Sequence, residues 1–179
     1  FSTMEMKLVN AISREHTMKR CLSDLKRDYD YIIIDCMPSL GMITVNALAC
    51  ADEVVIPVQS HYLAAKGMGN LLNTISSVRR HLNPDLRVDG VLLTLVDART
   101  NLAKETRKEL NTSYGNFIKI FDTQIPIAIK TAESSSQGKS IFSYDKTNKV
   151  AEAYSSFAKE LLNNERIKTK NAITKDNCR

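Results

Sequence analysis

The sequence contains no long apolar run. Hydrophobic residues make up 43% of its 179 residues, yet no stretch reaches the roughly 18–20 residues that a membrane-spanning helix needs. No signal peptide is recognisable, and the chain begins with Phe1 rather than Met. We therefore expect a cytoplasmic protein that does not act in a membrane, and we interpret the chain as a piece of a longer protein.

Metal ligands and catalytic triads are also missing from the pattern. The four cysteines show no metal-ligand spacing, and three of them lie in apolar segments, which predicts reduced thiols packed as small hydrophobic groups. The three histidines are far apart in sequence and pair with no Cys, Asp or Glu at metal spacing. We therefore interpret the histidines as structural or surface residues, and the pattern predicts neither a zinc site nor a Ser-His-Asp hydrolase. The residues concerned are Cys21, Cys36, Cys50, Cys178, His16, His61 and His81.

The positive charge is unevenly distributed. The formal net charge is +5, and residues 165–179 contain five basic against two acidic residues, which leaves the body close to neutral. A body of this kind allows a mild attraction to DNA but does not require one. We predict one domain over residues 1–164, followed by a basic, disordered tail over residues 165–179 that lacks an apolar face.

Apolar periodicity alternates between helix and strand along the chain. It predicts helices near residues 5–27, 40–51, 64–81, 101–112 and 147–163, and strands near 30–35, 53–58, 88–96 and 117–121. A long serine-rich loop over residues 134–138 precedes the last helix. Strands that alternate with helices in this way predict an α/β fold, with a doubly wound, mostly parallel sheet and helices on both faces.

The segment Tyr29–Gly41 (YDYIIIDCMPSLG) is the most informative part of the chain. Three successive isoleucines suit a central strand of a parallel sheet, which is covered on both faces. Asp35 then falls at the carboxyl end of that strand, where open α/β sheets bind ligands, and a carboxylate there can hold magnesium or its water shell. Ser39 can cap the next helix beside an anion pocket. A buried strand followed by a helix-capping aspartate explains the same pattern.

Two later segments are weaker candidates. Asp97–Asn101 follows the third predicted strand at the same edge, where Arg99 could face a phosphate or a DNA backbone, or could be an exposed arginine near a helix start. Ile125-Pro126 and the serine-rich loop could form the wall of a nucleotide base site or connect two elements. Four lysines give this region a basic character that is typical of a solvated face: Lys130, Lys139, Lys146 and Lys149.

Several segments together resemble the ParA/Soj-type partition ATPases, a branch of the deviant P-loop ATPases that also include MinD. The matching stretches follow the family's order and spacing, and the resemblance covers roughly residues 5–163. They are Tyr29–Gly41, Asn46–Gln59 (NALACADEVVIPVQ), Leu92–Leu102 (LLTLVDARTNL), Gly138–Asp145 (GKSIFSYD) and Val150–Leu161 (VAEAYSSFAKEL), with Asn10–Glu15 (NAISRE) ahead of them.

The resemblance implies an ATP-driven switch that binds Mg-ATP, forms a homodimer, binds DNA non-specifically on the nucleoid and responds to a ParB-like partner bound at a centromere-like site. Asp35 matches the Walker B-type aspartate that orders magnesium through water, and residues 37–41 match the switch loop. The implied cofactor-binding residues are Asp35, Pro38, Ser39, Gly41, Asp97, Ile125 and Pro126, and the implied DNA-binding residues are Arg99 and Lys130.

Two features depart from the family pattern. The phosphate-binding loop KGGxGK[ST] and the upstream aspartate motif are absent, so we expect the isolated chain not to hydrolyse ATP. Ile127 stands where the family often has arginine. A sheet without its N-terminal strand exposes an apolar edge, which predicts weak stability or self-association.

Two other classes of protein remain open. A MinD-like, membrane-associated ATPase would grip lipid with an amphipathic C-terminal helix, which the polar tail does not favour. The chain could also be a non-enzymatic remnant or adaptor.

Overall fold

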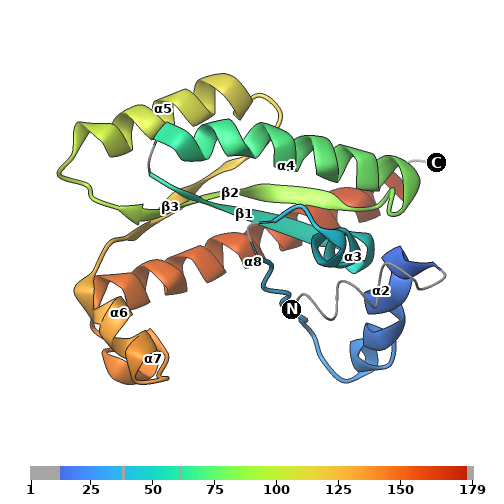
Figure 1. The fold of residues 1–179 in the computed structure, drawn as a ribbon, viewed down its shortest axis with the longest axis horizontal. Helices are drawn as coiled ribbons and strands as arrows, with labels where there is room; N and C mark the ends of the chain where they lie inside the picture. Colours follow the sequence, from blue (N-terminus) through green and yellow to red (C-terminus); the bar gives the residue numbers. More distant parts are fainter. Residues whose placement is uncertain (1–12, 38, 61, 177–179) are drawn as a thin grey trace. The chain divides into compact units, whose positions relative to one another are not determined.

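The computed structural model describes residues 13–37, 39–60 and 62–176 (Figure 1). The chain divides into two compact units. The first contains residues 1–54 and 66–89, and the second contains residues 55–65 and 90–179. No helix among the described residues is long and apolar enough to cross a membrane.

The first unit contains short helical segments and one buried helix. Two 3-10 turns, η1 (Arg14–His16) and η2 (Leu25–Arg27), flank α2 (Thr17–Leu22), so the described part of the helix predicted over 5–27 is interrupted. The predicted helix near 40–51 is confirmed as α3 (Met42–Cys50). Asn46 is 1% exposed and joins the two helices, since its Oδ1 accepts the Met18 N–H at 3.1 Å.

The C-terminal end of α3 is closed by an asparagine from a distant loop. Asn83 Nδ2 donates to the Leu48 carbonyl at 3.0 Å and to the Ala51 carbonyl at 2.8 Å. The last carbonyls of a helix have no partner within the helix, so this side chain satisfies two groups that would otherwise need water. Asn83 also follows α4 (Tyr62–His81), which confirms the predicted helix and its stop at Asn83-Pro84.

The strand predicted over residues 30–35 is not formed. Residues 31–37 have no regular secondary structure, and Ile33 is 92% exposed. Backbone N–H and C=O groups of a strand need a neighbouring strand, and none of the described strands pairs with this segment. Asp35 therefore does not lie at the carboxyl end of a strand in this structure, contrary to the expectation from the three isoleucines.

A three-stranded sheet has the order β1-β2-β3, formed by β1 (Glu53–Gln59), β2 (Arg87–Val96) and β3 (Ile120–Pro126). Strands β2 and β3 pair in parallel, with Val91 opposite Ile120 and Val96 opposite Pro126. The hydrogen bonds Arg87 N to Asp52 O and Ser60 N to Thr94 O run in the same order along β1 and β2, as parallel strands require. The predicted parallel sheet is confirmed.

The middle strand β2 is buried without alternation. Val91, Leu92 and Leu93 are all at most 5% exposed, as is typical of a parallel strand that is covered on both faces. Gly90 precedes them at a close approach to β3. A Cβ atom there would lie 2.7 Å from Phe121 Cε2 and 2.9 Å from the Lys119 carbonyl oxygen, so a side chain does not fit.

Four helices complete the second unit: α5 (Asn101–Tyr114), α6 (Ile129–Ser136), α7 (Ile141–Tyr144) and α8 (Lys149–Asp176). Figure 1 shows α5 and α8 on opposite sides of the strands of this unit. Its core joins β2 and β3 to α7 and α8 through Leu92, Phe121, Ile125, Ile141, Val150 and Ala151. Phe157 of α8 meets Phe121 edge to face, with ring centroids 5.0 Å apart.

Three boundaries in this unit differ from the sequence-based expectations. The fourth strand begins at Ile120 rather than 117, and three serines of the stretch predicted as a loop, Ser134–Ser136, form the end of α6. The tail predicted to be disordered from residue 165 continues α8 as far as Asp176.

Two of the cysteines expected in the interior, Cys21 and Cys36, are exposed, whereas Cys50 is buried as predicted. His61, Pro38 and Cys178 lie outside the described residues.

Strand β3 contains a β-bulge, where the Glu160 carboxylate of α8 accepts two backbone hydrogen bonds. Between Val91/Ile120 and Leu93/Gln124 the register advances by two residues on β2 and by four on β3. The extra residues turn the N–H groups of Asp122 and Thr123 away from β2, and Glu160 accepts both, each at 3.0 Å. Lys119 Nζ lies 3.1 Å from the same carboxylate. Burial would raise the pKa of Glu160, but these donors outweigh it and lower the pKa to about 2.

Candidate functional site

One group of candidate residues lies in the first unit, ahead of α3. Asp35 and Ser39 are exposed, and Gly41 is the N-cap residue of α3 with an extended backbone (φ −75°, ψ −179°). The sequence predicted that the Ser39 hydroxyl caps α3, but α3 has no side-chain cap hydrogen bond. Instead, Thr44 Oγ1 donates to the Ser39 carbonyl at 2.5 Å, which holds the turn against α3. The first turn of α3 contains no acidic residue, so nothing there repels an anion.

The second group lies at the carboxyl ends of β2 and β3. Val96 is the register partner of Pro126, and Ile127 N donates to the Val96 carbonyl at 3.1 Å. Asp97 directly follows Val96, so the structure brings together the two segments that the sequence predicted for this edge. The Ile125 side chain, however, is 4% exposed and packs in the core. The Ile125 side chain cannot contact a nucleoside unless the core opens, so it is not a side-chain ligand in this structure.

Sequence reasoning missed a strained residue at this edge. Leu95 has φ +51°, a left-handed conformation that is uncommon for a leucine. Buried Ser60, directly after β1, donates its hydroxyl to the Leu95 carbonyl at 3.1 Å. Strain of this kind persists only where surrounding contacts enforce it, and such positions cluster at functional sites. No signal in the sequence marks Leu95, because its side chain is an ordinary strand former.

Asp97 and Arg99 form an ion pair within one turn. Arg99 Nε donates to Asp97 Oδ1 at 3.0 Å, and Arg99 Nη2 donates to Asp97 Oδ2 at 2.9 Å. The Arg99 backbone N–H adds a third bond to Oδ1 at 3.1 Å. The Arg99 side-chain bond and then its backbone N–H lower the pKa of Asp97 to about 2. Asp97 is therefore ionised at neutral pH and directed at Arg99.

Lys130 is held by a second aspartate. It lies in the first turn of α6, and its Nζ donates to Asp145 Oδ2 at 2.6 Å. This hydrogen bond raises the pKa of Lys130 and lowers that of Asp145, whose other oxygen accepts the N–H and hydroxyl of Thr147. Both residues implied to bind DNA are therefore paired with a carboxylate of their own chain.

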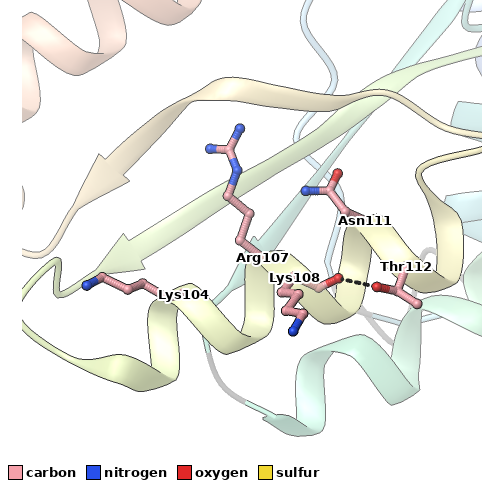
Figure 2. A pocket seen from close by; sticks show the side chains of 5 residues that line it. All are labelled: Lys104, Arg107, Lys108, Asn111 and Thr112. Atoms are coloured by element: carbon pink, nitrogen blue, oxygen red, sulfur yellow. Dashed lines mark hydrogen bonds between the residues drawn. The ribbon is translucent and has the colours of Figure 1, made fainter.

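An open depression of about 480 Å³ lies along α5. Figure 2 shows its lining side chains pointing in different directions from the helix, with the Thr112 hydroxyl bonded to the Lys108 carbonyl at 2.9 Å. Arg107 is paired with Asp122 at 2.9 Å. The lining contains no carboxylate or nucleophilic cysteine, so we assign it no catalytic role. The lining residues are Lys104, Arg107, Lys108, Asn111 and Thr112.

Within the described part of the chain, no group of three or more His, Cys, Asp or Glu side chains could hold a metal ion. A magnesium–phosphate site is compatible with this result, because magnesium bound to phosphates needs only one or two protein carboxylates.

Comparison with known proteins finds relatives that match most of this chain. The chain is 48% identical over 160 residues to the Bacillus subtilis protein named sporulation initiation inhibitor protein Soj, covering 89% of this chain and 62% of that protein. It is 43% identical over 159 residues to chromosome partitioning protein ParA of Myxococcus xanthus, covering 88% of this chain and 55% of that protein. The chain is similar to ParA/Soj proteins over about nine tenths of its own length. A family model described as an AAA domain also matches residues 1–88.

Solved structures agree with this ParA/Soj assignment at the level of the fold. Cobyrinic acid a,c-diamide synthase from Mycobacterium smegmatis superposes with a TM-score of 0.76 at 35% identity, over 90% of this chain and 58% of that chain. Another structure of that protein, with an ATP analog and magnesium bound, matches with a TM-score of 0.65 at 39% identity, over 69% of this chain and 50% of that chain. The chain thus spans between half and two thirds of the length of these relatives.

Proposed function

We propose that this chain is part of a ParA/Soj-type partition ATPase, which alternates between an ATP-bound, DNA-binding dimer and a released form. The observation that carries the proposal is its 48% identity to the B. subtilis protein named Soj over 89% of the chain. The alignment includes the acidic segment, the turn after β2 and the closing helix, which are the segments with candidate functional residues.

Mg-ATP is the proposed ligand, because a related structure contains an ATP analog and magnesium. The first unit contains groups that can bind magnesium and phosphate. Asp35 offers an exposed carboxylate for a magnesium-bound water, and the turn with Ser39 and Gly41 leads into a helix N-terminus suited to a phosphate. Asp97 and Pro126 remain proposed nucleoside-binding residues by family relationship alone.

DNA is the proposed partner of Arg99 and Lys130, through its phosphates. Both are cations at or beside the edge formed by the ends of β2 and β3, and Arg99 is 88% exposed. A ParB-like protein that stimulates hydrolysis, an ATP-dependent homodimer and a nucleoid location complete the proposal by family relationship. The isolated chain is proposed to be inactive as an ATPase, because it has no KGGxGK[ST] loop.

A chimera tests the ATPase function. The matched 160 residues of B. subtilis Soj are replaced by those of this chain, and ATP turnover is measured with DNA and a ParB-like partner. We expect turnover, and a loss of roughly 100-fold in the Asp35→Ala variant, as is typical when electrostatic support of the transition state is removed. Asp30→Ala is the matched control, since Asp30 is an exposed aspartate in the same segment. A folded chimera without turnover, or equal losses in both variants, would refute the proposal.

A further inference from the structure

Arg99 already has a bound anion in this structure, and that anion is Asp97. A guanidinium group has five N–H donors, and those on Nε and one Nη form the fork that carboxylates and phosphates occupy. Asp97 fills this fork with two bonds of 3.0 and 2.9 Å. A phosphate that approaches Arg99 in the same bidentate geometry must first displace the Asp97 carboxylate.

Asp97 cannot move away easily, because its backbone is fixed. Thr100 donates both its N–H and its hydroxyl to the Asp97 carbonyl, at 3.0 and 2.9 Å, and the Arg99 N–H is bonded to the Asp97 carboxylate. The strained Leu95, two residues upstream, is held by the hydrogen bond from Ser60. Arg99, by contrast, is a long side chain that is 88% exposed. The arginine is therefore the partner that can swing out to a ligand.

The same arrangement occurs independently at the other candidate cation. Lys130 Nζ is bonded to Asp145 Oδ2 at 2.6 Å. Two cations on separate segments of the second unit thus each have a carboxylate of their own chain in place of a phosphate. Asp145 is the less suitable position for a test, because its other oxygen also accepts two bonds from Thr147.

We infer that Asp97 is an internal competitor of the DNA phosphate for Arg99, so that it sets the affinity and the salt dependence of DNA binding. This inference rests on the proposed role of Arg99 in DNA contact. DNA engages Arg99 only by opening the ion pair with Asp97, and removal of the Asp97 charge leaves the guanidinium fork free. Each additional phosphate contact steepens the dependence of log affinity on log salt by about 0.9.

The test is a titration of a short, fluorescently labelled DNA duplex with the Soj chimera described above, at saturating ATP and at salt concentrations from roughly 50 to 200 mM. Asp97→Asn keeps one side-chain oxygen to accept the Arg99 N–H, so the turn is preserved. We expect this variant to bind about 3- to 10-fold more tightly than wild type, with a slope steeper by about 0.9. In the Arg99→Ala background the same substitution should change neither quantity.

Asp122→Asn is the matched control. It changes the net charge equally and releases another arginine, Arg107, from an ion pair of 2.9 Å. An equal gain in this control would overturn the inference, because the effect would then be one of net charge. So would unchanged or weaker binding by Asp97→Asn, a gain that persists without Arg99, or no DNA binding by either wild type or Asp97→Asn. These failures are distinct from failure of the proposed ATPase, which shows in the turnover of the chimera.

Discussion

The Glu160 carboxylate offers a direct test of how α8 is attached to β3. It accepts the N–H groups of Asp122 and Thr123 and pairs with Lys119, and its side chain is 18% exposed. We expect Glu160→Gln to lose much of this interaction, because an amide carries no charge and presents an NH₂ group to one of the two N–H donors. The pKa is lowered from 4.5 to about 2. At about 1.36 kcal/mol for each pKa unit this sets an upper bound of about 3.4 kcal/mol.

Solvent screening reduces that bound, so we expect Glu160→Gln to lower the free energy of unfolding by about 1–2 kcal/mol at pH 7. The sign of the pH dependence follows from the direction of the pKa shift. A carboxylate with a lowered pKa in the folded state stabilises the protein fully above pH 4.5, and this stabilisation is lost as the pH falls toward 2. At pH 3.5 the difference between wild type and variant should have shrunk by at least about 40%.

Urea denaturation followed by circular dichroism measures both quantities, because other carboxylates titrate alike in the two proteins and cancel in the difference. Glu109→Gln, an exposed glutamate on α5, is the matched control and should change stability little. Equal effects of the two substitutions, or a difference that stays constant between pH 7 and pH 3.5, would refute the assignment of Glu160 as an anchor of the β3 bulge.

Three further predictions concern other parts of the chain. Arg99→Ala should raise the pKa of Asp97 from about 2 toward 3.8, as measured by NMR titration, and an unchanged pKa would show that the ion pair is not populated in solution. Gly90→Ala should destabilise the protein by about 1–3 kcal/mol in urea denaturation, because its Cβ would meet the Lys119 carbonyl, whereas Gly67→Ala in α4, with no atom within 4 Å, should be neutral or stabilising. Ile33→Lys should reduce concentration-dependent self-association in sedimentation experiments, and equal association of both proteins would exclude this segment as the cause.

Elements with a local signal were predicted well. Helices α3, α4 and α5 and strands β1 and β2 lie where periodicity placed them, because an amphipathic or fully apolar pattern of this length has few alternatives. The carboxyl-end edge was also predictable, since parallel strands bring the residues that follow them to one side. Val96 is paired with Pro126 there, and Asp97 directly follows Val96, for that reason.

The incorrect predictions have causes that the local apolar pattern does not show. Residues 30–35 have strong strand propensity but no pairing partner among the described residues, so propensity alone does not make a strand there. Ile125 looked like part of a nucleotide wall, yet it faces the core because of the register of β3. The serine-rich α6 gave no helical signal, because serine often bonds to nearby backbone instead, and here three serine hydroxyls bond to carbonyls three or four residues earlier.

The sequence by itself determined the α/β class, the alternation of strands and helices, and the resemblance to ParA/Soj proteins, because these depend on periodicity and on motifs that are local in the chain. Only the tertiary structure decided which charged side chains have a partner and which partner they have. The pairing of Lys130 with Asp145 and the seating of Glu160 in the β3 bulge join residues 15 and about 38 positions apart, and no local pattern encodes such distances. The fork between Asp97 and Arg99 is local, but it depends on rotamers that only the folded turn selects.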